Sequence, residues 1–388
     1  MFNKPTLLML FYFLTVSIIS CESDPSRGSS TGLKNYPGSN GINYIFQKGQ
    51  EGYNCYRIPA LVRVSDNTLL AFAEGRKNSC SDTGDIDLIV KRSIDNGITW
   101  SRNIIVWDDS NNTCGNPAPI YVKQTGEVVL LMTWNNGSDS LREITSNNSI
   151  DTRRVYLTRS NNEGISWSDP EEITNDVKLS NWTWYATGPG SGIQIMKGEY
   201  KDRLVVGCDH RNQSGEAYSH TIFSDDNGYN WKLGGICPNS PTDECEVAEL
   251  TNNDLMLNMR ARTSFNRRKV AKSKDGGGTW DYIGFDNKLI TPTVQASLHR
   301  YSFIGDEINK NILLFSNPAS TENRENMTIR VSQDDGTTWN KSILLHDGFA
   351  AYSDLENFQD NRVAILYETG LNKSDRYHGI SFETIAID

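Results

Sequence analysis

The sequence lacks the cysteine and histidine spacings that mark zinc sites: it contains no Cys-x-x-Cys pair and no His-Glu-x-x-His motif. It also lacks an excess of positive charge, because 38 Lys and Arg residues stand against 48 Asp and Glu residues, for a net charge of −10. This balance argues against nucleic acid and anionic lipid as partners. Helix signals are scarce too, since long segments with apolar spacing of three and four between caps do not occur. Any arginine cluster is therefore informative, because the overall charge would not attract an anionic ligand.

Long apolar runs are also missing, and the N-terminal run over 7–19 is too short for a typical membrane span. Its charged start and the small residue at its end predict a signal peptide over 1–20. The ending "IISC" resembles a bacterial lipobox, with Cys21 as the lipidated first residue of an outer-membrane lipoprotein that faces the periplasm or the outside. Cleavage near Ser20 without lipidation, giving a periplasmic or secreted protein, is the alternative. Residues 21–40 then form a flexible tether, and the acyl chain is the only expected membrane contact of a monomer.

Six cysteines follow the predicted tether. An exported chain permits disulfides, and Cys237 with Cys245 closes the most plausible local loop. Sequence alone does not determine which cysteines are joined. The six are Cys55, Cys80, Cys114, Cys208, Cys237 and Cys245.

One octapeptide recurs along the chain, with the frame Ser-x-Asp-x-Gly-x-Thr-Trp. Asn162 replaces Asp in the second copy and Asn230 replaces Thr in the third. The intervals between copies suit one repeat per blade of a β-propeller. The copies lie at 93–100, 160–167, 224–231, 273–280 and 332–339.

The chemistry of the octapeptide predicts a hairpin turn. Asp or Asn accepts bonds from nearby backbone amides, Gly supplies a positive φ, and Trp provides a large apolar plug. A strand-like segment precedes each copy, so the copies join strands at the periphery and carry no catalytic role. The sequence therefore predicts an all-β propeller over 41–388, in which 380–387 pairs with 42–46 and removes two free sheet edges.

The segment "NCYRIPALV" contains a guanidinium, Arg57, inside a run that is typical of a buried β-strand. Pro59 places the segment near a strand end or sheet edge. An unpaired buried charge is very costly, so Arg57 requires a partner, either another side chain or a substrate.

Taken with the repeated octapeptides, "YRIPAL" resembles the Phe/Tyr-Arg-Ile-Pro motif of exo-α-sialidases (neuraminidases), whose octapeptide repeats are called Asp-boxes. The resemblance covers nearly the whole mature chain. It implies a six-bladed β-propeller with an active site at its central face. It also implies hydrolysis of terminal α-linked sialic acids from glycoproteins, glycolipids and oligosaccharides, with retention of configuration through a tyrosine nucleophile. No metal or organic cofactor is expected.

The resemblance assigns three arginines to the carboxylate of sialic acid. They are Arg57, Arg260 in "LNMR" and Arg324 in "ENRENMTIRVS". Planar guanidinium groups bind carboxylates through two parallel hydrogen bonds, which suits this role. Arg262 is the alternative to Arg260, because residues two apart in a strand face the same side.

The resemblance also assigns a general acid. The segment "EGRKNSCSDTGDIDL" contains Arg76, which matches an additional pocket arginine, and Asp82, which matches the catalytic aspartate. A carboxylic acid at this position protonates the glycosidic oxygen as the bond breaks. Asp85 and Asp87 are expected to be structural, because they fall within or at the start of the following strand pattern.

Tyr352 in "AAYSDLENF" matches the family's nucleophile, and Glu244 in "DECEVAEL" matches the base that activates it. The anomeric carbon of sialic acid already bears a carboxylate, so a neutral phenol avoids the like-charge repulsion that an attacking carboxylate would meet. A phenol has a pKa near 10 and needs a partner base. Glu246 and Glu249 are alternative bases, and Glu249 is the more typical of a structural position.

Glu368 in "ILYETG" matches a glutamate that orients the first arginine, and so offers Arg57 a permanent partner. The Gly-rich segment 187–194 is not a phosphate loop, because no helix follows it. It resembles a loop that lines the site, with Tyr185 beside it. Trp134 either contacts the N-acetyl group or packs within a blade, and packing is the simpler interpretation.

Other functions remain possible from the sequence. A non-catalytic sialoglycan-binding propeller would keep the arginines, but it could lose the acid or the nucleophile, and here Asp82, Glu244 and Tyr352 are all present. A trans-sialidase, or an enzyme specific for a deaminated sialic acid, would share the fold. Sialylated glycans are the expected partners in every case.

Overall fold

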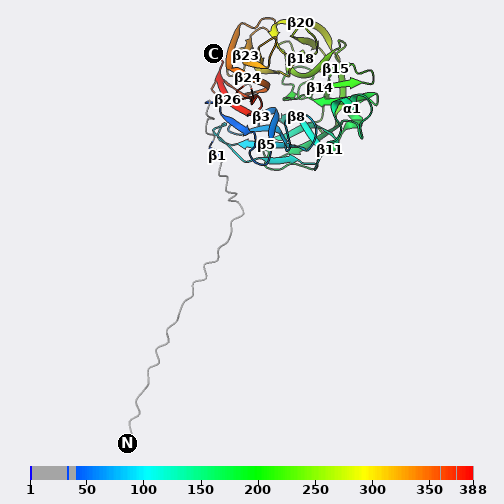
Figure 1. The fold of residues 1–388 in the computed structure, drawn as a ribbon. Coiled ribbons are helices and arrows are strands. Elements are labelled where there is room, and N and C mark those ends of the chain that lie inside the picture. The colour runs from blue at the N-terminus through cyan, green and yellow to red at the C-terminus, as the bar shows by residue number, and fades with distance from the viewer. Residues whose placement is uncertain (2–32, 35–40, 359, 373, 388) are drawn as a thin grey trace. The chain divides into compact units, whose positions relative to one another are not determined.

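The computed structural model describes residues 1, 33–34, 41–358, 360–372 and 374–387 (Figure 1). The chain divides into two units, Met1–Thr31 and Gly32–Asp388, and the helices and strands of the described residues belong to the second. The predicted signal peptide and Cys21 lie outside the described residues, apart from Met1, as does most of the predicted tether. No helix among the described residues is long and apolar enough to cross a membrane.

The first part of the second unit forms one sheet with the order β11-β10-β9-β8-β5-β4-β3, and β7 pairs with β5. It combines two antiparallel meanders that meet at a parallel bridge between Ile86 and Thr113. Its strands are β3 (Cys55–Arg63), β4 (Leu69–Arg76), β5 (Ile86–Ser93), β7 (Ile104–Trp107), β8 (Thr113–Val122), β9 (Glu127–Asn135), β10 (Arg154–Ser160) and β11 (Glu171–Glu172). The other elements here are the pair β1 (Leu33–Lys34) and β6 (Thr99–Trp100), and the helices α1 (Leu141–Thr145) and α2 (Thr174–Val177).

Antiparallel meanders continue to the end of the chain. One sheet comprises β12 (Trp182–Thr187), β13 (Ile193–Gln194), β14 (Leu204–Asn212), β15 (Ala217–Ser224) and β16 (Lys232–Ile236). The next comprises β17 (Thr242–Glu249), β18 (Leu255–Ala261), β19 (Arg267–Ser273) and β20 (Asp281–Ile290). The last comprises β21 (Ser297–Ser302), β22 (Ile312–Pro318), β23 (Glu325–Ser332), β24 (Lys341–Asn357), β25 (Arg362–Thr369), β26 (Gly379–Ala386) and, from the start of the described chain, β2 (Tyr44–Gln47).

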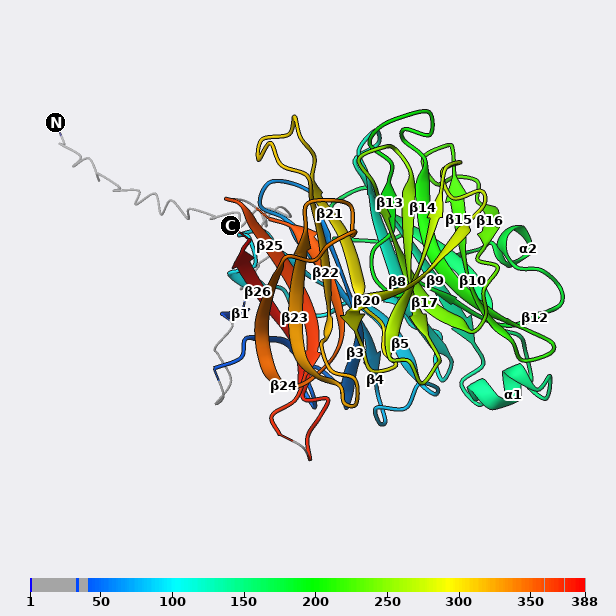
Figure 2. The same ribbon diagram turned by 90° about the horizontal axis from the view of Figure 1, so that it is seen from above.

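The sheets follow one another in chain order around a common centre, as Figure 1 shows. Figure 2 shows the same strands after a turn of 90°. β2 pairs antiparallel with β26, with Phe46 opposite Ile380 and Gln47 opposite Gly379. This pairing confirms the predicted closure by the two ends of the propeller segment. The all-β prediction is confirmed as well. Because closure pairs strands that would otherwise be free edges, it removes sites for aggregation.

Apolar clusters fill the space between neighbouring meanders and hold the inner strands in place. One cluster contains Ala60 and Phe72 from the first meander and Leu130 and Met132 from the second. β4 is buried along its whole length, and β3 is buried except for its last residue. Burial on both faces explains the apolar runs over 60–62 in β3 and 69–73 in β4. These buried strands, which lie close to the centre, therefore form a rigid frame for the side chains there.

The repeated octapeptides form turns between strands, as predicted. In the first copy Ser93 Oγ accepts a bond from the Gly97 amide at 2.8 Å, and Asp95 accepts bonds from the amide of Thr99 at 2.8 Å and its hydroxyl at 2.5 Å. Gly97 has a φ of 79°, which a side chain would disfavour. Trp100 is buried, and its ring lies 5.1 Å from that of Phe382. The corresponding Ser-to-amide bonds recur at Gly164, Gly228, Gly277 and Gly336.

The predicted disulfide between Cys237 and Cys245 is wrong. Cys55 and Cys80 form a disulfide with a Cα–Cα distance of 5.2 Å, whereas Cys237 and Cys245 are free and buried. Cys237 follows β16 at the outside of its sheet, and Cys245 lies in β17 of the next sheet. Proximity along the chain is a poor guide here, because consecutive strands at a sheet boundary belong to different sheets.

Candidate active site

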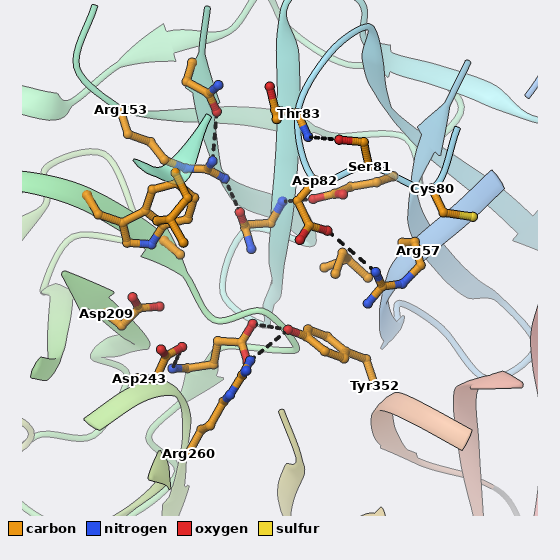
Figure 3. A pocket seen from close by; sticks show the side chains of 18 of the residues that line it. Arg57, Cys80, Ser81, Asp82, Thr83, Arg153, Asp209, Asp243, Arg260 and Tyr352 are labelled. Atoms are coloured by element: carbon orange, nitrogen blue, oxygen red, sulfur yellow. Dashed lines mark hydrogen bonds and ion pairs between the residues drawn. The ribbon is translucent and has the colours of Figure 1, made fainter. Parts of the chain in front are cut away.

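A cavity of about 500 Å³ lies at the centre. Side chains from each of the four larger sheets line it. Figure 3 shows Arg57, Asp82, Arg260 and Tyr352 pointing into it from separate segments. All but one of the predicted site residues line this cavity, and Glu368 is buried beneath Arg57. Those in the lining are Arg57, Arg76, Asp82, Glu244, Arg260, Arg324 and Tyr352.

Tyr352, Glu244 and Arg260 form a hydrogen-bonded triad. Tyr352 Oη donates to Glu244 Oε1, and Arg260 Nη1 donates to Glu244 Oε2 at 2.6 Å and to Tyr352 Oη at 3.1 Å (Figure 3). Burial and the charge of Glu244 raise the pKa of Tyr352 well above its ordinary value, although Arg260 and two further arginines act against this. The phenol is therefore neutral at working pH and has a carboxylate in place to receive its proton.

Glu368 is the buried partner of Arg57. Arg57 Nε donates to Glu368 Oε1 at 2.6 Å, and the same oxygen accepts the Ile58 amide at 2.8 Å. The other carboxylate oxygen accepts the Tyr352 amide at 3.2 Å. Burial acts to lower the pKa of Arg57, but the charge and hydrogen bond of Glu368, together with Tyr377 and Tyr352, outweigh burial and raise that pKa. One buried carboxylate thus fixes both the arginine on β3 and the backbone of the tyrosine on β24.

The backbone beside Arg57 is strained. Ile58 has a φ of 60°, which is unfavourable for a β-branched residue, and the pairing of β3 with β4 shifts register between Arg57 and Ala60. Such a conformation costs about 1–3 kcal/mol and persists only where surrounding contacts enforce it. Here the bond from Ile58 to Glu368 enforces it, and the bulge sets the direction of the Arg57 side chain.

Asp82 stands at the rim between two arginines. Its Oδ1 lies 2.8 Å from Arg76 Nη1 and 3.6 Å from Arg57 Nη1, and its side chain is 82% exposed. Loss of water on the pocket side acts to raise the pKa of Asp82, but Arg76 and Arg57 outweigh this and lower that pKa below its ordinary value. Arg76 is itself held by Glu74, whose Oε2 lies 2.6 Å from Arg76 Nη2.

Arg324 completes the group of arginines. Its Nη1 donates to Tyr377 Oη at 2.9 Å, and its Nη2 donates to the Thr293 carbonyl at 3.4 Å. In the described part of the chain it forms no ion pair with a carboxylate, so its charge is available to a ligand. The guanidinium carbons of Arg57 and Arg324 lie 5.3 and 5.7 Å from the centre of the Tyr352 ring. Together with the Arg260 contact, these distances show that the three arginines converge on one tyrosine.

The alternative to Arg260 occupies a different position. Arg262 also lines the cavity, but its Nε donates to Asp243 Oδ2, whereas Arg260 contacts both Glu244 and Tyr352. Geometry therefore favours Arg260 as the member of the arginine group.

The alternative acids and bases make structural contacts. Asp85 and Asp87 lie 3.3 and 3.0 Å from Lys77 Nζ, outside the cavity lining. Glu246 Oε2 accepts the Leu298 amide at 2.8 Å. Glu249 accepts the amides of Met196 and Lys197 at 2.7 and 2.9 Å.

Three expectations for flanking segments have different outcomes. The expected site-lining role of 187–194 is wrong: Ser191 to Gln194 line another cavity, of about 200 Å³. Tyr185 is fully buried and does not line the central cavity either. The packing interpretation of Trp134 is confirmed, because it packs against an apolar cluster and its Nε1 donates to Asp109 at 2.6 Å.

Sequence reasoning missed Arg153, which lines the cavity with only neutral oxygens as hydrogen-bond partners. Its guanidinium donates to Asn135 Oδ1 at 2.8 Å, to Thr133 Oγ1 at 2.9 Å and to Asn116 Oδ1. It also lies 4.1 Å from the centre of the Trp184 ring. Burial lowers the pKa of Arg153 to about 10. Its only sequence signal was its place in an Arg-Arg pair before a strand.

Two aspartates at the cavity wall were also missed. Burial, together with the charges of Asp243 and Glu244, raises the pKa of Asp209 well above its ordinary value. Burial acts in the same direction on Asp243, but Arg260 and Arg262 outweigh it and lower the pKa of Asp243. The only available signal was the position of Asp243 directly before Glu244. The environment of the cavity wall thus shifts the pKa values of these two aspartates in opposite directions.

Comparisons with known proteins agree with this site. Residues 67–365 match the family described as BNR repeat-like domain. The chain is 31% identical over 380 residues to a sialidase of Bacteroides fragilis, covering 92% of this chain and 68% of that protein. It is 30% identical to a sialidase of Micromonospora viridifaciens, of which it spans about half, 51%.

Solved structures agree with the fold. The Hadza microbial sialidase Hz136 matches with a TM-score of 0.80 and 30% identity, over 89% of this chain and 68% of that one. A leech intramolecular trans-sialidase matches with a TM-score of 0.74, but its 20% identity supports the fold alone. The relatives confirm the exo-sialidase activity expected from the sequence. The chain therefore belongs to the sialidase family of glycoside hydrolases.

Proposed function

We propose that this exo-sialidase releases terminal sialic acids from glycoproteins, glycolipids and oligosaccharides with retention of configuration, through a covalent intermediate on Tyr352. The triad of Tyr352, Glu244 and Arg260 carries the proposal, because it joins a neutral phenol directly to a base. Tyrosine nucleophiles are already known for sialidases as an exception to the pattern of two carboxylates.

Binding begins at the arginines. The carboxylate of the sialic acid docks between Arg57, Arg260 and Arg324, whose charges converge around the Tyr352 ring. Arg57 and Arg260 are held by Glu368 and Glu244, so these forks are already oriented when the ligand arrives. Binding therefore requires little side-chain ordering, which benefits affinity.

In the first chemical step, Tyr352 Oη attacks the anomeric carbon and transfers its proton to Glu244. The glycosidic bond breaks, and Asp82 protonates the departing oxygen. Because Arg76 and Arg57 lower the pKa of Asp82 in the free enzyme, Asp82 has to take up this proton once the substrate carboxylate engages Arg57. In the second step, water attacks the anomeric carbon and gives a proton to Asp82, while Tyr352 leaves and regains its proton from Glu244. Two displacements at one carbon retain its configuration.

The stereochemistry of the product tests this mechanism. Proton NMR of a sialoside digest should show the α-anomer of the free sugar first, followed by slow conversion to the β-anomer in solution. A β-anomer formed first would show a single displacement by water and would contradict the tyrosyl intermediate.

We propose that the propeller has six blades and that the protein is an exported lipoprotein with its anchor on Cys21. The succession of antiparallel meanders supports the first proposal. The "IISC" sequence and the Cys55–Cys80 disulfide support the second, because disulfides persist in oxidising compartments. When the protein is expressed in bacteria fed labelled palmitate, the label should enter the wild type and be lost in Cys21→Ala. A labelled Cys21→Ala variant would exclude this anchor.

A further inference from the structure

The loop over 77–85, between β4 and β5, carries Asp82 across the rim of the cavity. On the C-terminal side of Asp82 it is fixed to the neighbouring meander. Thr83 Oγ1 donates to the carbonyls of Gly137 and Asp139 at 3.0 and 3.3 Å, and the Gly84 amide donates to Thr113 Oγ1 at 3.1 Å. These bonds hold one flank of Asp82.

The other flank has few anchors. The Ser81 amide donates to Ser79 Oγ at 3.1 Å, a contact within the loop itself. Arg76 Nη1 donates to the Cys80 carbonyl at 2.7 Å, and the same nitrogen bonds Asp82. At the start of the loop, Lys77 Nζ lies 3.0 Å from Asp87 and 3.4 Å from Asp108. Between Lys77 and Asp82, the covalent anchor is the disulfide from Cys80 to Cys55.

The far end of this disulfide lies on the strand that binds the substrate. Cys55 is the fully buried first residue of β3, opposite Arg76 in the β3–β4 pair and two residues before Arg57. The bond therefore connects the loop of Asp82 to the frame that holds the carboxylate-binding arginine. Among the described cysteines, no other pair is joined, and the free ones are buried: Cys114, Cys208, Cys237 and Cys245.

We propose that the Cys55–Cys80 disulfide is a positioning element for catalysis, which keeps Asp82 within reach of the glycosidic oxygen. This inference rests on the proposed role of Asp82 as general acid. A general acid must stand at hydrogen-bonding distance from the oxygen it protonates, and a misplacement of about 1 Å can cost about a hundredfold in rate. Asp82 is largely exposed, so burial does not fix its side chain, and its position depends on the contact with Arg76 and on the loop backbone.

The experiment compares two substrates that depend differently on acid catalysis. The sugar hydroxyl that leaves 3′-sialyllactose is a poor leaving group and needs a proton. The phenolate that leaves a 4-nitrophenyl sialoside is stable without one. The kcat/KM of both substrates is measured for the oxidised wild type, for Cys80→Ala, and for wild type treated with dithiothreitol. The reagent converts the disulfide into two thiols and becomes its own cyclic disulfide.

We expect Cys80→Ala and the reduced wild type to lose about 10- to 100-fold in kcat/KM for 3′-sialyllactose and about threefold or less for the nitrophenyl sialoside. Reoxidation of the reduced enzyme should restore both values. Cys237→Ala is the matched control, because it also removes a buried sulfur but not a bond, and it should leave the ratio of the two substrates unchanged. If Cys80→Ala does not fold, the reduced and reoxidised wild type still gives the ratio.

The Asp82→Asn variant tests the proposed general acid independently of the disulfide. It should lower kcat/KM for 3′-sialyllactose by about 10²- to 10⁴-fold and affect the nitrophenyl sialoside far less. Equal losses on both substrates in Asp82→Asn would refute the role of Asp82 itself. If Asp82→Asn discriminates between the substrates while Cys80→Ala and the reduced enzyme do not, the positioning role of the disulfide is overturned.

Discussion

Replacing Tyr352 by phenylalanine is expected to lower kcat/KM for a fluorogenic sialoside by about a thousandfold or more. The substitution removes the proposed attacking atom and leaves Glu244, the proposed base, without its hydrogen-bond donor on Tyr352. The ring itself, which lies beside Arg57 and Arg324, is kept, so binding of the sialic acid carboxylate should change much less than turnover. Steady-state kinetics measures the loss of turnover, and inhibition by free sialic acid measures binding of the carboxylate.

The matched control for this variant is Tyr185→Phe. Tyr185 is also buried, but it does not line the catalytic cavity, so loss of its hydroxyl should change kcat/KM by about threefold or less. Activity near the wild-type level in a folded Tyr352→Phe enzyme would mean that this phenol is not the nucleophile.

Replacing Arg57 by lysine should lower kcat/KM by about 10- to 100-fold, mainly by raising KM. Lysine keeps the positive charge but loses the planar fork, so it cannot hold Glu368 through Nε and also present two parallel donors to a carboxylate. Hydrogen bonds between charged groups contribute about 1.5–3 kcal/mol each, which sets the size of the effect.

Arg63→Lys is the control for Arg57→Lys on the same strand. Arg63 ends β3 away from the catalytic cavity and donates to the Ser65 and Asp66 carbonyls at 3.1 and 2.9 Å. Arg63→Lys should change neither kcat nor KM by more than about twofold. Melting temperatures identify any loss of folding. A well-folded Arg57→Lys that binds and turns over substrate as the wild type does would assign Arg57 a purely structural role.

The octapeptide turns show what sequence can predict reliably. The bonds among Ser93, Asp95, Gly97 and Thr99 span few residues, so the residue types that make them stand together in the chain. The same holds for the "YRIP" segment, in which an arginine and a proline within an apolar run indicate both a strand and a buried charge. Arg57 needed a partner, and its placement beside Glu368 follows from that requirement.

The cysteines and Arg153 show where sequence reasoning ends. Cys237 and Cys245 are close in the chain but belong to different sheets, while Cys55 and Cys80 meet because β3 and β4 pair and the next loop folds back over them. Arg153 is held at the wall of the central cavity by Asn116, Thr133 and Asn135, which surround it. The partners in these contacts are not neighbours in the sequence, so no local sequence pattern predicts them.

By itself, the sequence determined that this chain is an all-β sialidase and which acid, base, nucleophile and arginines to test, because each of those residues stands in a short motif whose chemistry is local. Only the tertiary structure decided that the loop of Asp82 is bonded to the strand of Arg57 and that Glu368, the expected partner of Arg57, also holds the Tyr352 backbone. The physical reason is that closing the ring brings together strands from its opposite ends, and the contacts they make across the centre depend on register and bulges rather than on spacing along the chain.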